Sequence, residues 1–204
     1  MESETEDRAP RPRLKNRASP AALATLRRMQ VPPVLVARLQ RIRLFLTDVD
    51  GVLTEAQVAM GGATETKTFH IRDGYGLHLL QGAGIRVGWV SARPSEATAA
   101  RARDLGIDIV RQSKVPKVAL VEDIHRELGL GWDETLFVGD DVLDLGALKR
   151  AGFAATPSDA LLEARRLSHY VCRLPGGRGA VREVAELVLR AQGRWDALIE
   201  KFTS

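Results

Sequence analysis

Leu-Phe-Leu-Thr-Asp-Val-Asp-Gly-Val-Leu-Thr, at residues 44–54, is the stretch that decides the fold. A hydrophobic run of β-type residues ends there on two aspartates, one residue apart, and then on a glycine. Asp48 and Asp50 flank Val49, so their side chains would share a face of a continuing strand, and Gly51 allows the backbone to turn away sharply. The carboxyl ends of buried strands carry the chemistry of α/β proteins. Two carboxylates this close indicate a bound cation, although the stretch alone also fits a strand ending in a solvated turn.

Further strand ends along the chain carry polar groups of the same kind. Thr135-Leu-Phe-Val-Gly-Asp-Asp-Val-Leu-Asp144 repeats the pattern of an apolar run followed by acids. Val87-Gly-Trp-Val-Ser-Ala-Arg-Pro94 ends on a hydroxyl and a guanidinium, and a lysine follows the predicted strand at 107–110. These groups are the carboxylates of Asp140, Asp141 and Asp144, the hydroxyl of Ser91 and the ammonium of Lys117. Four strand ends therefore offer two acidic clusters, a hydroxyl and a lysine.

The body of the chain alternates predicted helices and strands. Helices are predicted at 20–30, 33–41, 74–83, 96–105, 116–128, 142–151, 159–167 and 180–192, and later strands at 86–90, 107–110, 135–138, 153–155 and 170–171. Strands separated by helices of about ten residues form right-handed βαβ units, so we expect a parallel sheet covered on both faces. Arms at 57–60 and 66–71 flank Gly61-Gly-Ala-Thr64 and predict a β-hairpin in the position of a lid. Nothing remains to build a separate cap domain.

Composition agrees with one enzyme domain. A chain of 204 residues, 45% of them hydrophobic, is long enough for a single core. We find no apolar run of about 18 residues that would span a membrane and no secretory signal in the acidic, polar opening. Cys172 is the only cysteine, which excludes an intrachain disulfide and fits a reducing cytoplasm.

The basic charge is confined to the start of the chain. Residues 1–43 hold ten Lys/Arg and four Asp/Glu, whereas residues 44–204 hold 20 and 22. A basic tail can contact phosphate-rich partners, but a solvated arm is the commoner case, and the sequence carries no motif for base recognition. We therefore expect no nucleic-acid partner.

The ordered set Asp-x-Asp-Gly, Ser, Lys and Gly-Asp-Asp resembles the haloacid dehalogenase (HAD) superfamily of phosphatases. Asp48–Thr54, Phe69–Gly76, Gly139–Asp141 and Gly176–Glu183 look more specifically like the 3-deoxy-D-manno-octulosonate 8-phosphate (KDO8P) phosphatase family, over roughly residues 36–195. The resemblance implies an α/β, HAD-like Rossmannoid three-layer sandwich at 32–204, with a hairpin flap. A basic extension at 1–31, disordered or partly helical, would precede it.

The resemblance implies a Mg²⁺-dependent phosphomonoester hydrolase that passes through an aspartyl-phosphate. Asp48 would be the nucleophile, and Asp50 would be the general acid that protonates the leaving group and then the base that activates water. The metal ligands would be Asp48, the backbone carbonyl of Asp50, and Asp140. Ser91 and Lys117 would bind the phosphoryl oxygens, with Lys114 as the alternative lysine.

Other members of the implied site have supporting roles. Asp141 and Asp144 would hold the lysine or metal-bound water. Arg72 and Arg93 would bind the carboxylate of a small phosphorylated sugar acid, because a guanidinium makes two contacts with a carboxylate. Arg178 would also bind the substrate, and the resemblance implies that its segment, Gly176–Gly179, reaches the active site of a neighbouring subunit. By the same resemblance we expect a homotetramer, with the hairpin contributing to assembly.

The sequence departs from the family pattern at three places. Ala92 puts a methyl group where a glycine usually stands, Pro116 replaces a polar residue, and Leu145-Gly146 replaces an aromatic-proline pair. Each change could lower activity or shift the substrate, but none removes a charged group of the implied site.

Two other functions compete with KDO8P hydrolysis. A sister group acts on nonulosonate 9-phosphates and typically carries a Glu at the position of Arg93 and Gly-Gly-Glu-Gly at 176–179, so Arg93 and Arg178 favour the octulosonate. Similar domains also occur as non-catalytic assembly modules, but pure scaffolding would not require Asp48, Asp50, Lys117 and Asp140.

Overall fold

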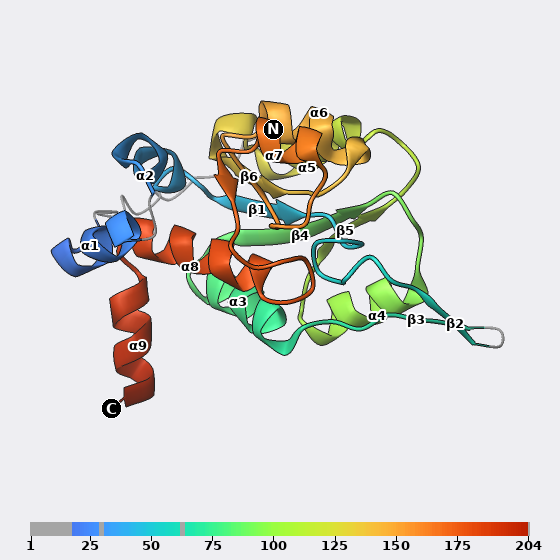
Figure 1. The fold of residues 1–204 in the computed structure, drawn as a ribbon, viewed down its shortest axis with the longest axis horizontal. Helices are drawn as coiled ribbons and strands as arrows, with labels where there is room; N and C mark the ends of the chain where they lie inside the picture. Colours follow the sequence, from blue (N-terminus) through green and yellow to red (C-terminus); the bar gives the residue numbers. More distant parts are fainter. Residues whose placement is uncertain (1–17, 29–30, 62–63, 204) are drawn as a thin grey trace, which may run out of the picture.

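The computed structural model describes residues 18–28, 31–61 and 64–203. A parallel sheet lies at its centre, with the strand order β5-β4-β1-β6-β7-β8 (Figure 1). The strands are β1 Leu44–Thr47, β4 Arg86–Ser91, β5 Ile109–Gln112, β6 Thr135–Val138, β7 Phe153–Thr156 and β8 Tyr170–Val171. Because parallel strands end at the same edge of a sheet, the segments that follow β1, β4 and β6 lie side by side.

Strand β1 is buried on both faces, which explains its continuous apolar sequence. Leu44 and Leu46 belong to the apolar cluster on one face of the sheet, and Phe45 belongs to the cluster on the other face. This alternation follows from the two-residue period of a strand. A strand that is apolar on both sides is what a helix-covered parallel sheet requires, so the run at 44–47 takes a central position.

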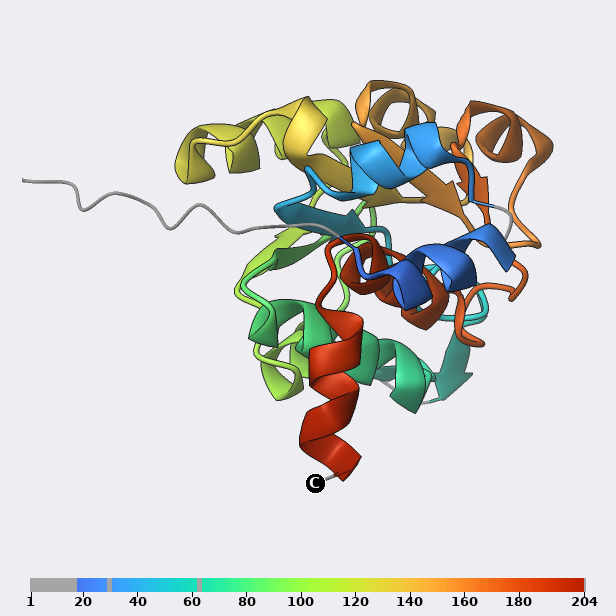
Figure 2. The same cartoon turned by 90° about the vertical axis from the view of Figure 1, so that its left-hand side faces the viewer.

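Helices cover both faces of the sheet (Figures 1 and 2). One face packs against α5 Lys117–Leu128, α6 Leu145–Arg150 and α7 Leu162–Leu167, and the other against α3 Ile71–Gly82, α4 Glu96–Asp104 and α8 Ala180–Ala191. Helices α1 Pro20–Arg28 and α2 Pro33–Leu39 contact α8, and α9 Trp195–Thr203 extends away from the sheet. The predicted three-layer α/β sandwich is confirmed, and the described residues form no separate cap domain.

The predicted hairpin is present but shorter than expected. It consists of β2 Ala59–Gly61 and β3 Thr64–Thr66, paired antiparallel, and it projects from the body of the molecule (Figure 1). The strand predicted at 66–71 ends at Thr66, and the chain continues from Lys67, which contacts Asp50, to the start of α3 at Ile71. Asp73 lies in the first turn of this helix, where an acid is favourable, so the start predicted at Gly74 was late.

Several other boundaries differ from the predictions. Strand β5 begins at Ile109 rather than at 107, and the helix predicted at 142–151 is divided into the 3₁₀ turn η2 Val142–Asp144 and α6. Helix α7 begins at Leu162 rather than at Asp159, because the Asp159 carboxylate instead accepts a hydrogen bond from the Gly176 N–H at 2.9 Å. A second 3₁₀ turn, η1 Trp132–Glu134, precedes β6.

The ends of the chain were predicted only in part. The helix predicted at 20–30 is α1, which is described to Arg28, and residues 1–17 of the predicted extension lie outside the described residues. Helix α9 was missed. No helix in the described ranges is long and apolar enough to cross a membrane.

Candidate active site

Asp48 directly follows β1 at the carboxyl edge of the sheet. Its N–H donates to the carbonyl of Val138, the last residue of β6, at 2.9 Å, and the residue is 8% exposed. The chain then reverses, with the N–H of Leu53 donating to the carbonyl of Val49 at 2.9 Å. Gly51 has a φ of 91° in this turn, a value that favours glycine. The local sequence thus delivers a carboxylate to the sheet edge and returns the chain within a few residues.

Lys117, the first residue of α5, is buried between two carboxylates. Its Nζ lies 2.8 Å from Asp48 Oδ1 and 2.6 Å from Asp144 Oδ1. The second oxygen of Asp144 accepts from the backbone N–H of Asp140 at 2.9 Å and from that of Asp141 at 3.3 Å. Both oxygens of Asp144 are therefore occupied, so this residue holds the lysine and the loop after β6 in place.

Asp140 completes a group of three carboxylates. Ligand oxygens of Asp48, Asp140 and Asp144 lie within 4.8 Å of one another. Asp140 Oδ1 is buried and has no hydrogen-bond partner among the described residues. A buried oxygen without a partner is costly, and hard divalent cations prefer carboxylate ligands. Since the oxygens of Asp144 are occupied, Asp48 and Asp140 are the pair that fits such a cation.

The absence of a side chain at Gly51 leaves room for the Asp140 carboxylate. A Cβ at residue 51 would lie 2.1 Å from Asp140 Oδ2 and 2.6 Å from Asp140 Cγ. The same glycine therefore allows the turn after β1 and the close approach of a second acid from the loop after β6.

Burial and crowding shift the pKa values of this cluster. Burial, and then repulsion by Asp144, raise the pKa of Asp48 to about 7, although Lys117 acts in the opposite direction. Burial and the charges of Asp48 and Asp144 raise the pKa of Asp140 to about 8. Burial alone would lower the pKa of Lys117, but the two carboxylates beside it outweigh burial and raise it. One ammonium does not balance three carboxylates, so a further positive charge is favourable here.

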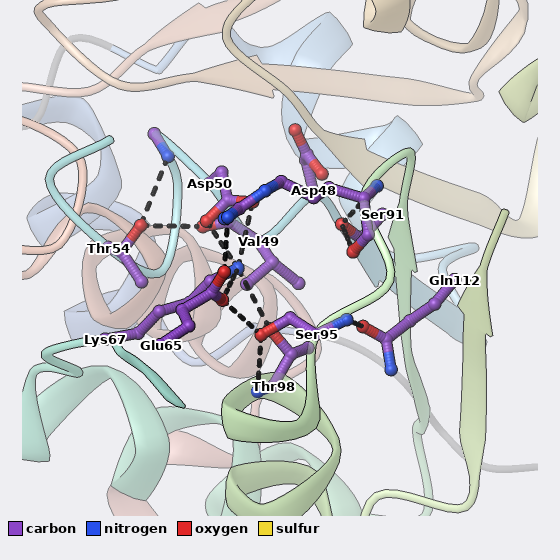
Figure 3. Close-up of polar contacts among 12 residues, drawn as sticks. Asp48, Val49, Asp50, Thr54, Glu65, Lys67, Ser91, Ser95, Thr98 and Gln112 are labelled. Carbon is purple, nitrogen blue, oxygen red and sulfur yellow. Dashed lines mark hydrogen bonds and ion pairs between the residues drawn. The ribbon is translucent and has the colours of Figure 1, made fainter. Parts of the chain in front are cut away.

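Asp50 points into a second polar cluster, whose other members are Lys67, Glu65, Ser95 and Thr98 (Figure 3). Its partner is Lys67, just after β3, whose Nζ lies 2.7 Å from Asp50 Oδ1 and 2.9 Å from Asp50 Oδ2. The same ammonium donates to Thr98 Oγ1 on α4 at 3.2 Å and lies 3.7 Å from Glu65 Oε1 on β3. The two aspartates of the sequence motif are therefore held by two different lysines.

Ser91 ends β4, next to β1, and is 1% exposed. Its Oγ accepts from the N–H of Arg93 at 3.2 Å, so the hydroxyl is held at the sheet edge. Arg93 is exposed, and its guanidinium pairs with Glu65 of the hairpin. Arg93, which was predicted to bind the substrate, thus contacts Glu65, the same acid that lies near Lys67.

Arg72 and Arg178 lie elsewhere, along two overlapping cavities of about 540 and 770 Å³. Both cavities are lined by these arginines together with His70 and Leu174. Arg178 also donates to Glu55 Oε2 at 2.8 Å, across to the loop that follows the Asp48 turn.

The glycine-rich segment at 176–179 packs on this loop within the same chain. The N–H of Gly177 donates to the carbonyl of Val52 at 2.9 Å, and a Cβ at Gly176 would lie 1.9 Å from the carbonyl oxygen of Gly51. Buried Asp73 accepts from the N–H groups of Gly179 at 3.0 Å and Arg182 at 2.7 Å. Asp73 on α3 therefore fixes the start of α8.

Comparisons with known proteins agree with this geometry. The family model described as haloacid dehalogenase-like hydrolase matches residues 64–152. The KDO8P phosphatase KdsC of Escherichia coli strain K12 is 36% identical over 165 residues, which are 79% of this chain and 87% of that protein. This chain belongs to the KDO8P phosphatase family of HAD-like hydrolases.

Solved structures of the family share the fold. The KDO8P phosphatase of Moraxella catarrhalis, in complex with a magnesium ion, a phosphate ion and KDO, has a TM-score of 0.80 and 36% identity, covering 82% of this chain and 97% of its own. The cobalt-bound enzyme of Haemophilus influenzae has a TM-score of 0.78 and 34% identity, covering 82% and 99%. The chain is accordingly a phosphatase of the HAD type.

Within this family framework, the structure brings together most of the residues predicted from the sequence. Asp48, Asp144 and Lys117 are buried and form one group with the half-buried Asp140, and Ser91 ends the neighbouring strand. Asp141 is exposed and caps η2, and Lys114 is exposed.

Sequence reasoning missed Lys67, Glu65 and Asp73. Glu65 and Lys67 are two residues apart, which places them on the same side of an extended arm, and that spacing was the available signal. Asp73 carried no comparable signal, because its partners begin a helix far along the chain.

Proposed function

We propose that this chain is a Mg²⁺-dependent phosphatase that hydrolyses KDO8P to KDO and phosphate. The proposal rests on the buried Oδ1 of Asp140, which has no hydrogen-bond partner within the described part of the chain and lies beside Asp48 and the Asp144-bound Lys117. It is supported by the family relative from Moraxella catarrhalis, which holds magnesium, phosphate and KDO together.

Asp48 is the proposed nucleophile. Its carboxylate would form a bond to phosphorus while the ester P–O bond breaks, which gives an aspartyl-phosphate. Asp48 and Asp140, with the backbone carbonyl of Asp50, would hold Mg²⁺, which supplies positive charge between the carboxylates and the anionic phosphoryl group. Lys117 and Ser91 would contact the phosphoryl oxygens, the lysine through charge and the serine through its hydroxyl.

Asp50 is the proposed general acid and base. It would give its proton to the leaving alkoxide in the first step and take a proton from the attacking water in the second, so the proton balance closes over one cycle. Asp50 is held by Lys67 rather than by Lys117, and its side chain is 25% exposed. It can therefore reach a substrate while remaining fixed.

The arginines are the proposed contacts of the sugar acid. Arg72 and Arg178 line the cavities beside the loop that follows Asp50, and Arg93 lies next to Ser91. A guanidinium can hold the carboxylate of an octulosonate by two hydrogen bonds. We also propose a cytoplasmic homotetramer, and a catalytic domain at 32–204 that does not require residues 1–31 for catalysis.

The test is phosphate release from KDO8P with and without Mg²⁺, for the wild type and for the variants Asp48→Asn and Asp108→Asn. Asp108 is exposed and directly precedes β5, at the sheet edge opposite to Asp48. The wild type and Asp108→Asn should release phosphate only with Mg²⁺, whereas Asp48→Asn should release none. Release by Asp48→Asn at the wild-type rate would contradict the proposal.

A further inference from the structure

Lys67 is a buried ammonium that the sequence analysis did not place in the site. Its side chain is fully buried, whereas that of Asp50 is 25% exposed. Burying an ammonium is costly unless it is paired, and its shortest contacts are to the two carboxylate oxygens of Asp50. The ammonium donates a hydrogen bond to Asp50 Oδ2 and forms an ion pair with Oδ1, which accepts no hydrogen bond from the described residues. The hydrogen bond and the ion pair together hold the carboxylate in one rotation about its last bond. Asp50 is therefore presented to solvent in one orientation.

The position of Lys67 is fixed in turn by α4 and by the hairpin. Its third short contact is Thr98 Oγ1, which is fully buried on α4. Glu65 on β3 lies 3.7 Å away and accepts from the Ser95 hydroxyl at 2.5 Å (Figure 3). Ser95 is the N-cap of α4, and its N–H donates to Gln112 Oε1 at 2.8 Å at the end of β5. The base of the hairpin is thus tied to the rigid edge of the sheet.

This arrangement serves the second half of the proposed reaction. Hydrolysis of the aspartyl-phosphate needs a carboxylate that takes a proton from water while the water oxygen bonds to phosphorus and the bond to Asp48 breaks. A general base acts only when it lies within hydrogen-bond reach of that water, and small displacements are costly. The interaction between Lys67 and Asp50 supplies this orientation without touching the phosphoryl group.

We propose that Lys67 is a positioning residue that orients Asp50 for hydrolysis of the phospho-enzyme, and that the hairpin base contributes to catalysis through it. The inference rests on the proposed role of Asp50. It adds that the base of the flap is a fixed part of the site.

The experiment follows p-nitrophenyl phosphate in rapid-mixing kinetics, with saturating Mg²⁺. Nitrophenolate leaves without needing a proton, so the first step depends little on Asp50, while the second step still requires the base. Lys67→Met should keep a rapid burst of about one nitrophenolate per site, while the steady-state kcat falls by about 10²-fold, the size of a general-base contribution. KM should rise less than threefold.

Two further variants separate positioning from a structural role. Lys67→Arg should recover part of kcat, because it keeps a cation beside Asp50. In the Asp50→Asn background, Lys67→Met should cause no further loss, since residues that act through one group are not additive. The exposed Lys149→Met is the control and should match the wild type in burst and in steady state.

Other outcomes would overturn the inference. A burst lost together with the steady-state rate, a rise in KM with kcat unchanged, or multiplicative losses in the double variant would each refute it. If Lys67→Met does not fold, Thr98→Val removes one contact of the ammonium and should give a smaller loss confined to kcat, and an equal loss of the burst would refute the inference. A wild type that releases no phosphate from KDO8P would refute the proposed function, whereas the burst and steady-state results above bear on the role of Lys67 alone.

Discussion

Replacing Gly51 by alanine tests whether the turn after β1 determines the position of the second acid. The new methyl group would lie 2.1 Å from Asp140 Oδ2, 2.6 Å from Cγ and 3.0 Å from Oδ1, so the whole carboxylate must move. The backbone has φ 91°, which costs a residue with a Cβ about 1–2 kcal/mol. Loss of a well-placed group at a metal site weakens metal binding by about 10–100-fold, and we expect this loss in Mg²⁺ affinity.

Gly84→Ala is the matched control. Gly84 has φ 77°, but a Cβ there meets no atom within 4 Å, so this variant carries the backbone cost without a collision. Calorimetric titration of Mg²⁺ and thermal unfolding of both variants separate the two effects. Both should lose about 1–2 kcal/mol of stability, and only Gly51→Ala should lose metal affinity. Unchanged Mg²⁺ affinity in Gly51→Ala, or an equal loss in Gly84→Ala, would refute the reasoning.

The remaining predictions concern charge and anchoring. Burial raises the pKa of Asp48 to about 7 and that of Asp140 to about 8. Because the folded protein binds these protons more tightly than the unfolded chain does, the protonated carboxyls add to the free energy of unfolding at acid pH, and this stabilisation is lost as the pH rises through the raised pKa values. The Tm of the metal-free protein should therefore fall relative to that of Asp140→Asn between about pH 4 and pH 8, from the pKa of an unfolded aspartate to the raised pKa values, and Mg²⁺ should restore the Tm most at high pH. Lys117→Met leaves two buried carboxylates without their partner and should lower the free energy of unfolding in urea by about 3–5 kcal/mol. The exposed Lys114→Met should change it by less than about 0.5 kcal/mol. Equal effects of the two variants would be inconsistent with Lys117 as the lysine of the site. Asp73→Ala removes two hydrogen bonds to the start of α8 and should cost about 2–3 kcal/mol in the same assay, and an unchanged unfolding midpoint would show that these bonds contribute nothing.

The sequence predicts the sheet and its acidic edge because both depend on local patterns. Apolar runs that end on Asp48 and Asp140 identify the strands, and parallel pairing then brings their ends together. The buried pairing of Lys117 could be anticipated only from the order of the motifs, since a lysine at the start of a helix is usually solvated.

Contacts between distant segments could not be read from the sequence. The contacts of Lys67 and Glu65 with α4 depend on where the hairpin meets that helix. The hydrogen bond from the Arg182 N–H to Asp73 depends on the packing of α3 against α8. The boundary errors have the same origin, since Asp159 ties down a loop instead of beginning a helix. Local propensity is weaker than such tertiary contacts.

The ratio of kcat/KM values for KDO8P and a nonulosonate 9-phosphate measures whether the proposed site selects an octulosonate phosphate. Both substrates should be measured with Mg²⁺, for the wild type and for Arg93→Glu, which introduces the residue typical of the nine-carbon sister group. The wild type should strongly prefer KDO8P, and Arg93→Glu should show a reduced preference. A wild type that prefers the nine-carbon substrate would rule out the proposed specificity.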